Sequence, residues 1–162
     1  MPSLVADWLE ALAAWPVAAY LRDSTVAYAT LNGAHILAIA LVVGSIATLD
    51  LRVFGLFRDV PLAALARPLS RVAAAGVLFA VTTGFLLFSV RPAAYAANPA
   101  FLTKISLVAL GVTNALLLRA NRHWRLAHDG GETHVSIKVA AMLSLVIWAG
   151  AVFAGRWIGF LQ

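Results

Sequence analysis

One histidine inside a long apolar stretch is the residue best placed to do chemistry. His35 lies within residues 28–49, which contain no Asp, Glu, Lys or Arg. An ionisable side chain at such a position costs about 2 kcal/mol or more unless it is neutral and paired, or binds something. Imidazole is a common axial ligand of haem iron. His35 therefore predicts either a hydrogen-bonded polar pair or a haem ligand.

A lysine lies near the start of another apolar stretch. Lys104 is the fourth residue of residues 101–118. We expect both stretches to enter the membrane from the same side, which would bring Lys104 near His35. There it would be a second haem ligand or a close neighbour of the first. The alternative is a lysine whose ammonium group extends to the membrane surface.

Other polar residues could complete either kind of site. Asn32, one helical turn before His35, and Asn114 could pair with the histidine without any cofactor. Three arginines are expected at the same end of the bundle and could contact haem propionates through charge-assisted hydrogen bonds, or simply extend to the membrane surface. They are Arg22, Arg91 and Arg156.

Three further histidines form a separate group. They are His123, His128 and His134, with Asp129 and Glu132 in the same segment. Zinc or copper could use such ligands, but spacings of five and six residues match no tight helical pair, so a polar loop is the favoured interpretation. The chain has no cysteine, which disfavours copper(I) transport.

The composition indicates which elements must position these residues. The 162 residues are 62% hydrophobic and only 12% charged, far more apolar than a soluble domain. Four apolar segments reach the length of about 20 residues that a spanning helix needs. They are residues 28–49, 72–90, 101–118 and 135–154. We predict a single transmembrane domain over residues 1–162, an all-α membrane protein built as an antiparallel four-helix bundle.

The segment before the first span has a different pattern. Apolar residues recur at helical spacing over residues 3–21, with Trp8, Trp15 and Tyr20 among them. This is typical of an amphipathic helix lying in the membrane interface. No cleavage site follows it, so we expect the segment to be retained.

Basic residues set the expected orientation. They gather in the first and third loops, which should therefore face the cytoplasm of a bacterial inner membrane and leave both termini in the periplasm. The net charge of +5 then reflects topology, and nucleic acid is not an expected partner. The sequence contains no phosphate loop, nucleophile elbow or dinucleotide fingerprint. It leaves open whether the chain forms a homo-oligomer.

Several motifs resemble a known group of membrane proteins. The run from Leu31 to Gly55, the segment Asn98 to Lys104 and the ending Ala154 to Ile158 resemble small bacterial membrane proteins related to the copper resistance protein D superfamily. This likeness covers nearly the whole chain and implies a four-helix membrane fold.

A more distant resemblance is to the bacterial membrane-bound protoporphyrinogen oxidase. That family has a histidine in its first span, followed by a glycine and an Arg-Leu-Phe type ending, and a lysine opening its third span. The resemblance implies that His35 and Lys104 are the essential residues, with Gly44, Arg52 and Phe54 matching the rest of the motif. It also implies a link to haem.

Together these features predict a membrane protein that binds haem b and transfers electrons, with a porphyrin- or quinone-linked oxidase as its enzymatic form. A quinone or a periplasmic redox protein is the expected partner. Two alternatives stay open: a cofactor-free accessory or assembly subunit of a membrane complex, and a metal transporter.

Overall fold

The computed structural model describes residues 4–128 and 133–161, and this part of the chain is helical with no strand. Four helices within it are long and apolar enough to cross a membrane. They are α3 (Thr25–Val53), α4 (Leu62–Val90), α6 (Pro99–Ala120) and α8 (Val135–Trp157), the last continued by a short 3-10 turn, η1 (Ile158–Phe160). Each contains the span expected from the sequence and extends beyond it. The predicted fold class, an all-α membrane bundle, is confirmed.

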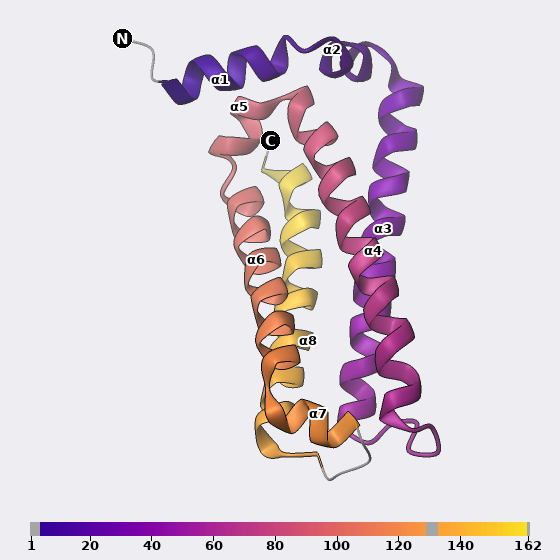
Figure 1. The fold of residues 1–162 in the computed structure, drawn as a ribbon. Helices are drawn as coiled ribbons and strands as arrows, with labels where there is room; N and C mark the ends of the chain where they lie inside the picture. The colour runs from indigo at the N-terminus through magenta and orange to yellow at the C-terminus, as the bar shows by residue number, and fades with distance from the viewer. Residues whose placement is uncertain (1–3, 129–132, 162) are drawn as a thin grey trace.

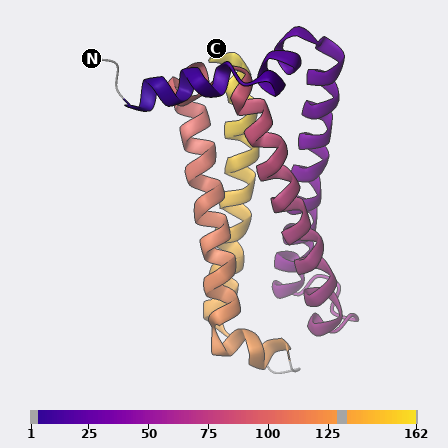
Figure 2. The ribbon, with the colours of Figure 1, turned by 45° about the horizontal axis from the view of Figure 1, so that its top comes forward.

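The N-terminal segment is two helices rather than the single helix predicted over residues 3–21. Helix α1 (Leu4–Ala13) and helix α2 (Pro16–Asp23) meet at an angle of 58°. Pro16 causes the break, because proline disfavours helical backbone in the residue before it. Trp15 accordingly has an extended ψ of 134°. Figures 1 and 2 show both helices lying across one end of the bundle, next to the C-terminus.

Polar caps define where the long helices begin. The Ser24 side chain accepts a hydrogen bond from the Ala27 amide at 3.2 Å at the start of α3. Asn98, which follows the short helix α5 (Pro92–Ala97), accepts from the amides of Ala100 and Phe101 at the start of α6. Such caps satisfy backbone N–H groups that have no partner within the helix. These caps set where α3 and α6 begin, and therefore how far along each helix His35 and Lys104 lie.

The four long helices pack as two close pairs. Helix α3 packs most extensively on α4, and α6 on α8, while α3 also contacts α8 and so joins the pairs (Figure 1). Small residues allow the close approach within each pair. A Cβ on Gly76 would lie 2.8 Å from Val42 Cγ2, and one on Gly111 would lie 2.9 Å from Trp148 Cε2.

The opposite end of the bundle holds an apolar cluster beneath α7 (Arg122–His128). Its buried residues come from α3, α4, α7 and α8 and are Val53, Leu62, Ala127, Ile137 and Ala141. The outward surfaces of the long helices are apolar as well, with Leu37, Leu78 and Leu117 each more than 65% exposed. Exposing so much apolar surface to water would cost a large amount of free energy, so this surface is suited to contact with lipid.

Candidate functional site

His35 lies at a point to which all four long helices contribute. Its Nδ1 lies 2.9 Å from Thr83 Oγ1 on α4, and its Nε2 lies 3.3 Å from Lys104 Nζ on α6. Helix α8 contributes Gly155, where a Cβ would lie 3.4 Å from Lys104 Cδ. His35 and Lys104, expected on the same side of the membrane, are in direct contact. The site lies in the half of the bundle nearer to α1, α2 and α5.

The hydrogen bonds of Thr83 indicate how the imidazole is protonated. The Thr83 hydroxyl donates its only proton to the Phe79 carbonyl at 2.6 Å, one turn earlier in α4. Its oxygen can then only accept from His35, so we assign the ring proton to Nδ1. This leaves the Nε2 lone pair directed at Lys104, where it can accept a proton or bind a metal ion.

Two glycines leave space for this pair. A Cβ on Gly84 would lie 3.1 Å from His35 Cε1, tighter than ordinary contact, so a side chain there would press on the imidazole. A Cβ on Gly155 would lie 3.4 Å from Lys104 Cδ, which is ordinary van der Waals contact. The histidine and the lysine therefore pack directly against the backbones of α4 and α8.

An aromatic cluster lies about one helical turn from the site, toward the nearer end of the bundle. Phe88 and Phe101 stack with ring centroids 5.4 Å apart, and Tyr95 lies 5.5 Å from Phe101. Phe88 is one turn beyond Gly84 on α4, and Phe101 is one turn before Lys104 on α6. By their positions along α4 and α6, these rings lie between the polar pair and the nearer end of the bundle.

The two asparagines proposed as partners of His35 do not serve that role. Asn114 Nδ2 donates to the Ala140 carbonyl at 3.0 Å and so ties α6 to α8. Asn32 is exposed and forms no hydrogen bond with His35. The imidazole points toward α4 and α6, where its two ring nitrogens face Thr83 and Lys104. Thr83, which the sequence analysis did not single out, is the partner.

The three arginines lie at the expected end of the bundle but make different contacts there. Arg22 donates to the carbonyls of Val90 at 3.2 Å and Ala13 at 2.7 Å, which ties the N-terminal helices to the end of α4. The Arg156 guanidinium lies 4.6 Å from the centre of the Phe160 ring. The Arg91 side chain is exposed and, within the described residues, donates no hydrogen bond, although its charge acts on Tyr28 of α3.

The histidines at the other end form a pair. The rings of His123 and His134 stack with centroids 4.0 Å apart. Partial removal from water, followed by the nearby charges of His134 and Arg122, lowers the pKa of His123. Among residues 4–128 and 133–161 no three His, Asp or Glu side chains are grouped as metal ligands. The side chain of His128, together with Asp129 and Glu132, lies outside the described part.

A buried carboxyl near the α7 end has no basic partner in the described residues. Asp50 is only 4% exposed, and its Oδ2 forms no hydrogen bond with any of them. The Ser144 hydroxyl on α8 is its polar neighbour. The ion pair with Arg52 that sequence proximity suggests does not form, because Arg52 Nε donates instead to the Val60 carbonyl at 2.8 Å.

The fold and the site together define a multi-pass helical membrane protein with a half-buried histidine, lysine and threonine cluster shared by its spans. Residues 16–161 match the model of a family of unknown function, DUF6644, and the chain belongs to that family. No curated protein and no solved structure matches the chain. The matched residues include all four long helices.

Proposed function

We propose that this protein binds haem b within the bundle and transfers electrons, with His35 as an axial ligand of the haem iron. One observation carries the proposal. The Nδ1 of His35 is held by the Thr83 hydroxyl, which leaves the Nε2 lone pair as the free ligand atom of the ring, with Lys104 Nζ 3.3 Å from it. Metal-binding histidines almost always donate their other ring N–H to such an acceptor, which fixes the tautomer and the ring orientation.

Two cations near His35 suit the negatively charged edge of a haem. Lys104 Nζ is close enough to act as the second ligand or as a neighbouring charge. Arg91, at the end of α4, is the arginine best placed for a propionate, because its side chain forms no hydrogen bond within the described residues.

A bound haem would supply one-electron chemistry at a potential set by its axial ligands and the local polarity. The chain's own residues have simpler roles. Thr83 orients the imidazole, and the rings of Phe88, Tyr95 and Phe101 lie between it and the nearer end of the bundle. A quinone or a periplasmic redox protein would exchange electrons at the site, and a porphyrin oxidase is the enzymatic form of the same proposal.

Absorption spectroscopy of the purified protein tests this proposal. We expect the full chain, expressed with ample porphyrin supply and purified in mild detergent, to show a Soret band that shifts on reduction. His35→Ala should abolish the band. Asn32→Ala, an exposed position one turn away, should retain it. A colourless wild type, or full haem content in His35→Ala, would overturn the assignment.

A second candidate function is favoured by the same contacts. Both ring nitrogens of His35 already have protein partners, Thr83 and Lys104, so the cluster could be a self-sufficient polar contact in a cofactor-free accessory subunit. In that case the protein would be colourless, and His35→Ala would destabilise the bundle without any spectral change. The spectrum therefore separates the two candidates.

We also propose that both termini face the periplasm of a bacterial inner membrane. The support is the distribution of arginines, all at the α7 end. Arg52 lies in the last turn of α3 and Arg58 in the loop after it, Arg67 and Arg71 lie in the first half of α4, and Arg119 lies in the last turn of α6. Fusion of a reporter that is active only in the periplasm to either terminus should give activity. Activity confined to a fusion in the α3–α4 loop would reverse the orientation.

A further inference from the structure

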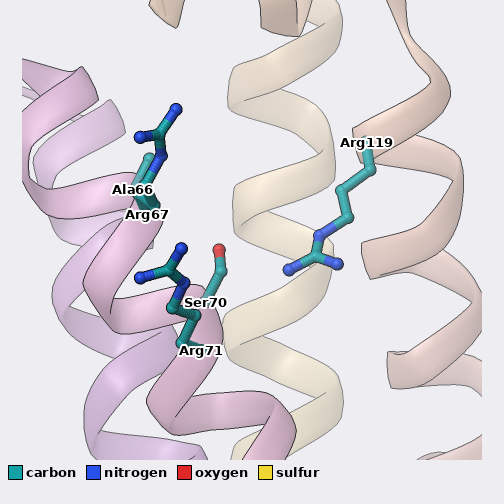
Figure 3. Close-up of a pocket in the computed structure, with 5 residues that line it drawn as sticks. All are labelled: Ala66, Arg67, Ser70, Arg71 and Arg119. Atoms are coloured by element: carbon teal, nitrogen blue, oxygen red, sulfur yellow. The ribbon is translucent and has the colours of Figure 1, made fainter.

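At the α7 end, away from His35, an open pocket of about 380 Å³ lies between α4 and α6. Its lining residues are Ala66, Arg67, Ser70, Arg71 and Arg119. Figure 3 shows Arg119 reaching from α6 toward the Ser70 hydroxyl on α4, with Arg67 and Arg71 on the same helix as the serine. Residues separated by about 50 positions in the sequence thus line one space.

Among the described residues, no acidic side chain lines this pocket, so its positive charge is not balanced there. The side chains of Arg67, Arg71 and Arg119 form no hydrogen bond or ion pair with any residue between 4 and 128 or between 133 and 161. Arg67 and Arg71 are four residues apart on α4, a spacing at which like charges destabilise a helix. Membrane orientation explains why arginines occur at this end, but here arginines from two helices also line one pocket. An anion between them would offset the repulsion.

We propose that this pocket binds the phosphate of an anionic phospholipid headgroup. Guanidinium groups match phosphate oxygens through paired N–H donors, and a serine hydroxyl can add another hydrogen bond. Arg71 and Arg119 also lie at the boundaries of the apolar stretches predicted at residues 72–90 and 101–118, which is the headgroup level.

The surface beside the pocket favours a lipid over a soluble phosphate compound. Leu116, one turn from Arg119 toward the middle of α6, is 60% exposed, and Leu78, two turns from Arg71 on α4, is 67% exposed. Acyl chains attached to a phosphate in the pocket would lie along these side chains. A free phosphate ion would use only the arginines and Ser70.

The experiment compares anions added to the purified full chain in mild detergent, with the thermal unfolding temperature as the measurement. We expect phosphatidylglycerol to raise this temperature in a saturable way, and phosphatidylcholine of the same chain length, or inorganic phosphate alone, to have little effect. Arg119→Gln and Arg71→Gln should each weaken phosphatidylglycerol binding about fivefold, the usual effect of one basic residue at an anionic surface.

Arg125→Gln is the matched control, because Arg125 is an exposed arginine on α7 that does not line the pocket. It should bind phosphatidylglycerol like the wild type. Equal losses in Arg125→Gln and Arg119→Gln would overturn the site, since only net charge would then matter. A full effect of inorganic phosphate would overturn the lipid as ligand. Two variants on different helices keep the test valid if one of them folds poorly.

Discussion

Replacing Thr83 by valine removes the hydroxyl that holds His35 and keeps the shape of the side chain. In the native protein this hydroxyl donates to the Phe79 carbonyl at 2.6 Å and faces His35 Nδ1 at 2.9 Å. The neighbouring Thr82 makes the same kind of bond to its own helix, to the Leu78 carbonyl at 2.9 Å, but does not contact the histidine. Thr82→Val is therefore a matched control, and the difference between the two variants isolates the contact with His35.

The expected magnitude follows from measured hydrogen bonds between membrane helices. Such bonds contribute about 0.6 kcal/mol on average and up to about 1.7 kcal/mol. We expect the free energy of unfolding of Thr83→Val to fall below that of Thr82→Val by an amount in that range. Unfolding by sodium dodecyl sulfate in mixed micelles, followed by tryptophan fluorescence, would measure it. The effects of independent substitutions add to within ~0.3 kcal/mol. A difference between the two variants smaller than this would mean that the hydrogen bond between Thr83 and His35 does not form.

The same two variants separate the proposed cofactor from the contact alone. If His35 binds iron, loss of the group that orients it should weaken haem binding about 10–100-fold. Titration with haem, read at the Soret band, should show this loss in Thr83→Val and not in Thr82→Val. A loss of stability with unchanged haem affinity would mean that Thr83 supports the bundle but not the ligand.

Two further predictions concern helix packing and pH. Gly76→Ala should lower the free energy of unfolding by about 1–3 kcal/mol, because its Cβ would lie 2.8 Å from Val42 Cγ2. Gly44→Ala is the control and should not destabilise the bundle, because nothing lies within 4 Å of a Cβ there. Equal effects of the two substitutions in the same micelle assay would contradict the observed packing of α3 on α4. Partial burial and His134 lower the pKa of His123, so folding favours its neutral form. The stabilisation from the stacking of His123 on His134 should therefore be complete above about pH 6.5 and be lost as the pH falls through the lowered pKa of His123. NMR titration of the imidazoles should show a higher His123 pKa in His134→Ala, and an unchanged value would exclude the influence of that ring.

The pattern of apolar residues was sufficient to predict the membrane spans. Stretches of about 20 residues without charge cannot be solvated by water or by a small soluble shell, so their number and approximate positions follow from hydropathy. The ends were less predictable, because caps and turns depend on local bonds. Helix α4 begins at Leu62, ten residues before the expected span, and Pro16 divides the N-terminal segment into two helices.

The candidate site was predictable only in part. His35 and Lys104 stand out by type, because ionisable side chains in apolar helices are costly and therefore rare. Thr83 does not stand out, because a threonine in a membrane helix commonly bonds to its own backbone, as Thr82 does. Nothing in the sequence distinguishes the two neighbours. Only the rotation of α4 against α3 decides which of them meets the imidazole.

The sequence by itself determined that this chain is a bundle of membrane helices carrying one histidine and one lysine at similar depth. Composition and length are properties of the chain alone, so they needed no knowledge of contacts. The tertiary structure decided which residues meet: Thr83 rather than Asn114 at His35, and Arg119 beside Ser70 at the other end. These contacts join residues far apart in the chain, and they depend on how each helix is turned about its axis, which hydropathy does not encode.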